Sequence, residues 1–222
     1  MIGFRIRLKA VGLLTVGWGV PEVVGADVVH ARKLVGDRFE LYIPGSSVKG
    51  ALRTSASRVA EAYGFTSCGE VKPEMIEQAH KSMGGPCDVC RLFGYPGTRP
   101  EGHAKLYVSD FRAVGELTTE IVTRVSLSDT TLTAKEDMLY TMENLPPGVE
   151  FEGFVRLEEG ARELLPLLLL AMAELRTGRF GRRSVVDLKV EDEGRLDGLI
   201  GDEWKPLLQR MRRWLWERVV QP

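Results

Sequence analysis

The sequence predicts an α+β fold with a ferredoxin-like (RRM-like) core and inserted segments. Its 222 residues suit one elaborated domain, residues 1–222, better than two independent domains. Strand-type alternation and helix-type spacing of apolar residues follow each other in the order strand, helix, strands, helix, strand once loop-rich segments are set aside. A sheet covered by helices on one face is the simplest arrangement that satisfies this order.

The first strand is predicted to have one buried and one basic face, because apolar and basic residues alternate over residues 4–9. A glycine-rich loop follows, and residues 39–43 return to strand character before Pro44 and Gly45 turn the chain.

A helix is predicted to follow this turn, with Ser46 or Ser47 as its cap. Val48 begins its apolar stripe, which keeps helical spacing. Lys49 and Arg53 are four residues apart, so we expect them to share one exposed face.

Residues 64–103 are predicted to be an inserted zinc-binding or lid region. They contain a short helix over residues 73–83, a cysteine pair and a glycine-rich loop. Strands are predicted around residues 104–108, 121–127 and 149–157, with an extended hairpin or loop over 128–147 between the last two. A helix over 161–176 and a strand over 185–190 follow. A terminal helix is predicted over 202–220, and its apolar stripe consists of Trp204, Leu207, Leu208, Met211 and Leu215.

Composition argues against a membrane protein and against a protein that binds nucleic acid through bulk positive charge. The net charge is −1, 44% of residues are hydrophobic, and no apolar run is long enough to span a bilayer. The N-terminus lacks a secretory pattern, so we expect a cytoplasmic protein. Residues 1–60 nevertheless hold nine basic and four acidic residues, which predicts one basic side for RNA and an acidic side for a neighbouring subunit.

The three cysteines suit a metal site in a reducing compartment better than a disulfide framework. Cys68, Cys87 and Cys90 supply three thiolates, and tetrahedral zinc needs a fourth ligand. We predict His80 for that position, with His103 as second choice. Such a structural zinc would stabilise the insertion, which has no large apolar core. Three free cysteines in a loop are the alternative.

The start of the first helix has the properties of an anion site. Amide groups at a helix start, the hydroxyls of Ser46 and Ser47, and the nearby Lys49 suit a phosphate, and Gly45 would let the backbone approach it closely. An ordinary helix cap with a solvated lysine explains the spacing equally well.

Four segments, taken together, resemble one known family. YIPGSSVKGALR, residues 42–53, is similar to the IPGSSLKG-LR signature of the RAMP superfamily, the RNA-binding proteins of CRISPR–Cas systems. CDVCRLFG, residues 87–94, resembles the C-x-x-C-x-L-F-G element of type III effector subunits. TGRFGR, residues 177–182, resembles the C-terminal glycine-rich loop of the family, and Gly25-Ala26-Asp27 falls where backbone subunits carry Gly-x-Asp.

The resemblance implies a Csm- or Cmr-type subunit that self-associates into a filament along a CRISPR guide RNA, beside other effector subunits. It implies that residues 42–50 hold the guide backbone and that a thumb hairpin within residues 124–147 wedges between bases. It further implies that single-stranded target RNA pairs with the guide and is cut by endoribonuclease chemistry with a divalent cation, Mg or Mn, and the aspartate at position 27.

A carboxylate on a loop can help to hold a divalent cation or accept the proton of a 2′-hydroxyl, so a catalytic role for Asp27 is chemically sound. A loop aspartate bonded to its own backbone is the alternative. The residues after Asp27, Val28-Val29-His30, depart from the family pattern. His30 therefore raises a rival function, a metal-independent endoribonuclease that processes guide RNA. A non-catalytic structural subunit of the same complex is the third possibility.

Further RNA contacts are predicted around the glycine-rich turn, where arginine can bind phosphate and an aromatic ring can stack on a base. Arg176 and Arg183 flank this turn, and a solvated arginine cluster is the alternative. The remaining RNA-binding candidates are Arg53, Arg124, Ser126, Gly178, Arg179, Phe180 and Arg182.

Overall fold

A computed structural model describes residues 1–17, 26–96, 102–192 and 194–217. Its main sheet has the strand order β2-β3-β5-β8-β1-β9, and β4 also pairs with β8. All these pairings are antiparallel. The strands are β1 (Ile2–Ala10), β2 (Arg32–Val35), β3 (Arg38–Ile43), β4 (Leu106–Val108), β5 (Phe111–Ala113), β8 (Glu150–Leu157) and β9 (Val186–Glu191). The protein therefore has a mixed α/β fold built on an antiparallel sheet.

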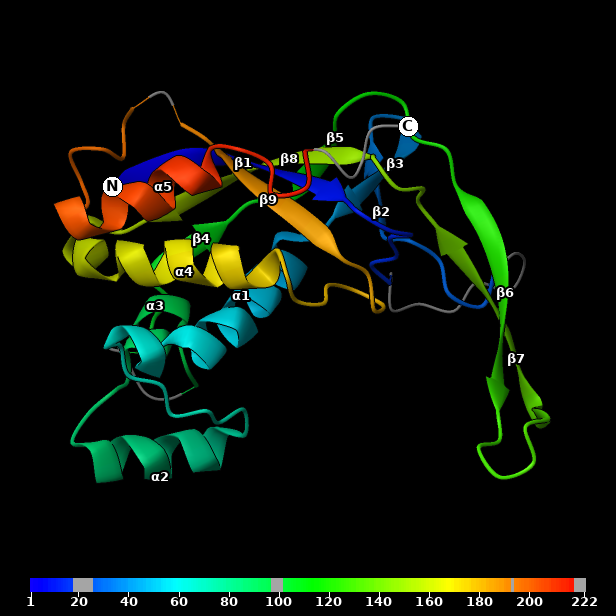
Figure 1. Cartoon of the computed structure of the whole chain (residues 1–222), viewed down its shortest axis with the longest axis horizontal. Coiled ribbons are helices and arrows are strands. Elements are labelled where there is room, and N and C mark those ends of the chain that lie inside the picture. Colours follow the sequence, from blue (N-terminus) through cyan, green and yellow to red (C-terminus); the bar gives the residue numbers. More distant parts are fainter. Residues whose placement is uncertain (18–25, 97–101, 193, 218–222) are drawn as a thin grey trace.

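Two helices, α1 (Gly45–Val59) and α4 (Leu165–Leu175), pack against each other beneath the sheet (Figure 1). α4 follows the 3₁₀ helix η2 (Glu159–Leu164), and nine of its residues are buried. α4 is apolar all round because it lies between α1, β9 and the C-terminal helix. The alternation in β1 confirms the predicted strand, since its apolar residues are buried and its basic residues are not.

The insertion lies away from the sheet (Figure 1). It follows η1 (Glu61–Tyr63) and contains α2 (Pro73–Met83) and α3 (Asp88–Phe93). α2 has the predicted bounds, from a proline at its start to Gly84 in the left-handed conformation at its end. It buries only Ile76 and His80, so apolar contacts alone stabilise it little.

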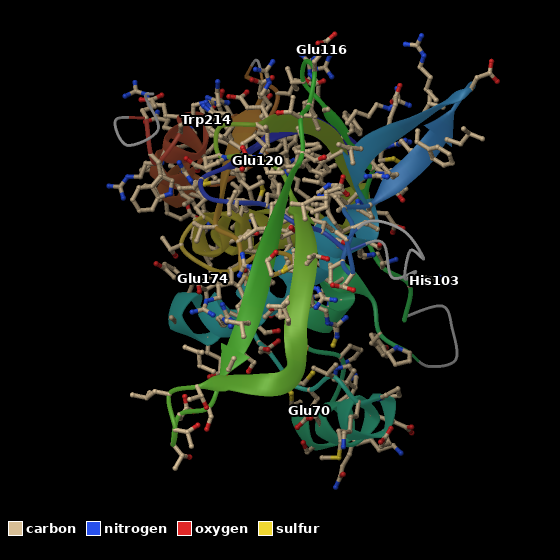
Figure 2. The ribbon with its side chains drawn as sticks, turned by 90° about the vertical axis from the view of Figure 1, so that its right-hand side faces the viewer. Glu70, His103, Glu116, Glu120, Glu174 and Trp214 are labelled. Carbon is tan, nitrogen blue, oxygen red and sulfur yellow. The ribbon has the colours of Figure 1, made fainter. Side chains whose placement is uncertain are left out.

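A two-stranded ribbon, β6 (Glu120–Leu127) and β7 (Ala134–Asn144), projects from the body of the molecule (Figures 1 and 2). In Figure 2 the ribbon faces the viewer, with Glu120 at the start of β6. The predicted thumb, residues 124–147, overlaps this ribbon, which begins earlier. The sequence left an extended hairpin or a loop open where β7 lies and did not set the bounds of this strand, because residues 134–144 show no regular apolar alternation.

Two local predictions are wrong. α1 has Pro44 as its N-cap and no side-chain cap, so neither Ser46 nor Ser47 caps it. The Asp110 carboxylate takes that role, because Gly45 N–H donates to Asp110 Oδ1 at 3.0 Å.

The predicted terminal helix over residues 202–220 is instead η3 (Asp202–Trp204) and α5 (Lys205–Met211), and residues 218–220 lie outside the described part. Leu215, a predicted member of its apolar stripe, is 49% exposed. The helix ends early because Asp187 accepts hydrogen bonds from the backbone N–H groups of Leu215 and Trp216. Arg176 also donates to Arg213 O at 2.9 Å. None of the helices in the described ranges is long and apolar enough to cross a membrane.

Candidate nucleic-acid interface and metal centre

The start of α1 is packed more tightly than the sequence indicated. A Cβ atom on Gly45 would lie 2.3 Å from Val108 O and 2.6 Å from Ser109 O, so only glycine fits against this bend of the sheet. The N–H of Gly45 is already bound to Asp110, and Asp110 lies 3.4 Å from Lys33 Nζ. Gly45 therefore serves packing, and the expected approach of its backbone to a ligand is wrong. Of the two serines in the first turn, Ser46 is exposed and Ser47 half-buried.

Lys49 and Arg53 do not share an exposed face, because both are half-buried. Burial, reinforced by the charge of Arg53, lowers the pKa of Lys49. Arg53 is directed into the insertion, where it donates to Gly94 O and, at 3.2 Å, to Cys90 Sγ. The side-chain ammonium group of Lys49 makes no hydrogen bond or ion pair within the described residues, so its charge is available to an anion.

The arginines at the glycine-rich turn, residues 177–184, differ in their exposure to solvent. Arg179 and Arg182 are exposed, as is Arg183. Arg176 is buried and forms a 2.6 Å ion pair with the buried Asp187, so it belongs to the core. Phe180 is 2% exposed, and the prediction that it stacks on a base is wrong.

Phe180 closes the turn through two backbone hydrogen bonds to Ser184, which explains why an aromatic ring here points inward. Gly178 is half-buried, and its pro-Cβ position lies 3.7 Å from Arg58 Nη1.

Asp27 is exposed and is bound to the β6–β7 ribbon. Its Oδ2 accepts hydrogen bonds from Thr141 N at 2.6 Å and Thr141 Oγ1 at 2.8 Å, and its N–H donates back to Thr141 Oγ1 at 3.0 Å. These bonds, led by the one from the Thr141 backbone, lower the pKa of Asp27. The carboxylate is therefore ionised at neutral pH and fixed to β7. Gly25, the glycine of this motif, lies outside the described residues.

His30 is fully buried, with both ring nitrogens engaged by the backbone. Nδ1 accepts a hydrogen bond from Val16 N at 3.2 Å, and Nε2 donates to Tyr42 O at 3.1 Å. Burial lowers its pKa to about 4. This histidine holds the loop of Asp27 in place and has no nitrogen available to take a proton from RNA.

One segment, residues 14–17, joins the predicted RNA-contacting elements; we call it the junction strip. Leu14 exchanges backbone hydrogen bonds with Leu145 at the base of the ribbon, and Thr15 O accepts from Arg182 N at 2.9 Å. Val16 O accepts from Ala31 N at 2.8 Å. Ala31 O in turn accepts from Tyr42 N, directly before the start of α1. The ribbon base, the glycine-rich turn, the Asp27 loop and the start of α1 are therefore neighbours.

Arg124 and Ser126 lie on one face of β6, where alternate residues are half-buried. Arg124 is paired in register with Tyr140 of β7. The other face of the ribbon exposes Val125, which is paired in register with the exposed Leu139. Both predicted contacts thus lie on the projecting ribbon, beyond its base.

The cysteine–histidine cluster, Cys68, His80, Cys87 and Cys90, unites the four predicted metal ligands. One ligand atom from each residue lies within 4.8 Å of all the others. Cys87 and Cys90 are buried, Cys68 is partly buried, and His80 is 8% exposed. Nε2 of His80 is buried and has no hydrogen-bond partner in the described ranges. Three thiols and one imidazole at this separation fit a tetrahedral zinc ion. His103 is exposed and outside the cluster.

The thiols of the cysteine–histidine cluster are hydrogen-bonded to each other and to the backbone. Cys68 Sγ lies 3.6 Å from Cys90 Sγ, and Cys90 N donates to Cys87 Sγ at 3.4 Å. The side-chain hydrogen bond with Cys90 lowers the pKa of Cys87 to about 4, and the same bond raises the pKa of Cys90. The arrangement favours a thiolate at Cys87, the form that binds metal.

Three residues with structural roles at these sites were missed in the sequence. Thr141 binds Asp27, Asp110 binds the start of α1, and Thr15 donates to Glu143 O at 2.7 Å within the junction strip. None belongs to a recognisable motif, and only the position of Asp110 directly after a predicted strand offered a signal.

Comparison with known proteins gives a family match and a likeness to solved structures. A family model described as the RAMP superfamily matches residues 7–185. A chain in a solved structure titled "Type IV-B CRISPR Complex" is similar to this one, with a TM-score of 0.55 and 17% sequence identity over 86% of this chain and 91% of that chain. At this identity the likeness concerns the fold. No match was found among curated proteins.

Proposed function

Because the chain belongs to the RAMP superfamily, we propose that it is a guide-RNA-binding subunit of a CRISPR effector complex. The fold likeness to a chain of a type IV-B CRISPR complex supports the assignment to an effector complex. The cysteine pair followed by Leu92-Phe93-Gly94 supports the type III, Csm or Cmr, class within it. Copies of the chain would then lie along one guide, with target RNA and other subunits as partners.

We interpret the core as ferredoxin-like. Apart from β2 and β3, which lie between β1 and α1 in the chain, the main-sheet strands before and after the two helices are β1, β4 with β5, β8 and β9, and their order across the sheet is β9-β1-β8-β5. This order supports a βαββαβ arrangement, in which both helices cover one face. The ribbon and the insertion are then additions to this core.

The observation that carries the proposal is the junction strip, which joins the ribbon base, the glycine-rich turn and the Asp27 loop, all predicted to contact RNA, to the start of α1. Lys49, Arg179 and Arg182 would contact phosphates of the guide, because they are cations without an ion-pair partner within the described residues. Arg124 and Ser126 would contact the strand where the ribbon crosses it. Phosphate contacts of this kind hold RNA without reading its sequence, as a guide-binding subunit requires.

For cleavage of target RNA, we propose that Asp27 acts at the base of the ribbon. In this reaction a 2′-hydroxyl loses its proton, its oxygen bonds to the adjacent phosphorus, and the 5′-oxygen leaves with a proton. A bound divalent cation, Mg or Mn, would neutralise charge on the phosphate. Thr141 holds the ionised Asp27 in one orientation, so the carboxylate can bind that cation or accept the proton. A single carboxylate leaves the remaining ligands to the RNA itself.

Zinc in the cysteine–histidine cluster would have a structural role. The cluster connects the loop before α2, α2 and α3, and Arg53 links it to α1. The insertion would therefore be fixed to the helix that begins at the guide-binding turn.

The test is cleavage by the assembled complex with Asp27→Asn. This variant keeps the size and hydrogen-bonding capacity of the side chain, so we expect guide binding and assembly to be unchanged and cutting of guide-paired RNA to be lost. Cutting at every site by the variant would instead make the chain a non-catalytic structural subunit. A metal-independent nuclease using His30 has less support, because both nitrogens of that ring are engaged. Full activity in excess EDTA would nevertheless reinstate it.

A further inference from the structure

The face of the sheet opposite α1 and α4 carries a group of aromatic and arginine side chains that the proposed guide contacts do not use. Tyr107 on β4 is paired in register with Arg156 on β8, so both side chains point to this face. Phe154 lies two residues before Arg156 and shares its face. The apolar side chains that alternate with them, such as Val155, are buried on the helix side.

Arg156 lies between the two rings. Its guanidinium carbon is 5.1 Å from the centre of the Tyr107 ring and 5.6 Å from that of Phe154. Tyr107 is 54% exposed and Arg156 is also exposed. We call these three residues the stacking platform. Such an arrangement holds each planar group in place before any ligand binds.

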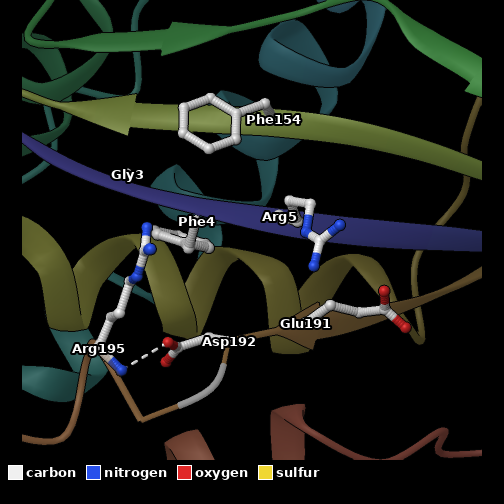
Figure 3. Close-up of a pocket in the computed structure, with 7 residues that line it drawn as sticks. All are labelled: Gly3, Phe4, Arg5, Phe154, Glu191, Asp192 and Arg195. Carbon is white, nitrogen blue, oxygen red and sulfur yellow. Dashed lines mark hydrogen bonds between the residues drawn. The ribbon is translucent and has the colours of Figure 1, made fainter.

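Gly3 allows Phe154 to lie over the neighbouring strand. A Cβ atom at position 3 would be 2.6 Å from Phe154 Cζ, so a larger residue would displace the ring. Beside the ring is a hollow of about 220 Å³, lined also by Arg5, Glu191 and Arg195 (Figure 3). The stacking platform is thus continuous with a hollow that has arginine at its edge.

The charges around the stacking platform favour an anionic ligand. The nearby Glu152 and Glu191 are within ion-pair distance of Arg7, at 3.9 and 3.3 Å, and Glu152 also lies 3.9 Å from Arg5. In contrast, Arg156 and Arg195 have no carboxylate partner for their guanidinium groups in the described ranges. The acidic groups are therefore neutralised, and two cations remain.

We propose that the stacking platform binds single-stranded RNA, with bases on Tyr107, Arg156 and Phe154 and phosphates at Arg195. Aromatic and arginine planes on an open sheet are the features that bind unpaired bases in RRM-type domains, and stacking is tolerant of sequence. The platform lies on the sheet face away from α1, so it is a second contact in addition to the proposed guide track. It would hold a flanking or unpaired segment of RNA.

The first experiment separates the two contacts. Lys49→Ala with Arg182→Ala removes two proposed guide contacts, and binding of a fluorescent oligouridine is measured by anisotropy before and after. A drop in affinity supports the guide track, whereas unchanged affinity counts against that track and leaves the platform proposal intact.

The second experiment adds Tyr107→Ala and Arg156→Ala to that background. Loss of one or two stacked bases should weaken the remaining affinity by about 5- to 100-fold. Phe39→Ala with Arg38→Ala is the matched control, because Phe39 is 71% exposed on β3 and Arg38 is exposed next to it. Equal affinity of the platform variant and the control would overturn the proposal.

Two further measurements keep the test informative. Arg156→Glu alone changes only an exposed side chain, so it should preserve the melting temperature yet weaken binding at least as much. Ultraviolet crosslinking should label the peptide that contains Phe154 or the one that contains Tyr107. If these variants bind RNA normally but lose other subunits on co-purification, the platform binds protein and the RNA proposal is wrong.

Discussion

Replacing Cys87 by serine should abolish the proposed zinc binding and destabilise the whole chain. The four ligand atoms of the cysteine–histidine cluster lie within 4.8 Å of one another, so every ligand is needed to complete a tetrahedral site. Serine is a poor zinc ligand of nearly the same size. We therefore expect the zinc content to fall from one ion per chain to near zero. Because serine is no larger than cysteine, the substitution itself should not overpack the core.

The magnitude follows from the coupling between metal binding and folding. At a free zinc concentration 1,000 times the dissociation constant, a bound ion adds about 4 kcal/mol to the free energy of unfolding. In a domain of this size, 1 kcal/mol shifts the melting temperature by roughly 2–4 °C, so the expected loss is about 8–16 °C. The loss should reach the main core, because Val89 and Leu92 of α3 are buried in it.

The assays are elemental analysis of the purified protein and calorimetry with and without a chelator. Chelation of the wild type should reproduce the Cys87→Ser melting curve, and the chelator should leave the variant unchanged. His103→Asn is the matched control, since His103 is exposed and lies outside the cluster. Wild-type protein with far less than one zinc per chain, or a variant that melts like wild type, would refute the reasoning.

Three further predictions concern pH, the core and RNA. Burial lowers the pKa of His30 from 6.5 to about 4. As the pH falls, the imidazole of the unfolded chain is therefore protonated before that of the folded chain. The contribution of the neutral His30 to the free energy of unfolding is complete above about pH 6.5 and falls by about 3 kcal/mol towards pH 4. His30→Gln should flatten that part of a denaturation-versus-pH curve, and an unchanged slope contradicts the assignment. Arg176→Met leaves the buried Asp187 unpaired and should lower the free energy of unfolding in urea by about 3–5 kcal/mol; a loss below about 1 kcal/mol contradicts it. Lys49→Ala should reduce the salt slope of RNA binding by about one, whereas Arg38→Ala should not.

The elements that the sequence predicts well are those with a strong local signal. β1 alternates between buried and exposed residues, and α2 begins at a proline and ends at Gly84. The prediction of a long terminal helix was wrong because Asp187, which is distant in the sequence, binds the backbone of Leu215 and Trp216. The local sequence does not indicate such a contact. The helical spacing of apolar residues alone therefore predicted a helix that was too long.

The grouping of the cysteine–histidine cluster was predicted for a different reason. Three cysteines are few enough to be expected together, and only the fourth member required a choice; the structure places His80 beside them. The choice favoured the histidine on a short helix just before the cysteine pair. Side-chain direction at the other sites was predicted less well, because inward and outward orientations of arginine and phenylalanine give the same sequence pattern in a turn.

Several residues in the segments that resemble the family motifs stabilise the fold and are not available to bind RNA. Gly45 is fixed by the backbone oxygens of residues 108 and 109, Arg53 supports the insertion, and Phe180 closes its turn from inside. At the proposed RNA-binding site, the family motifs would therefore supply mainly residues that pack the fold. What remains for binding are Lys49 and the exposed arginines of the glycine-rich turn. Substitutions at Gly45 or Phe180 should consequently lower the melting temperature and RNA affinity together, whereas Lys49→Ala should lower RNA affinity alone.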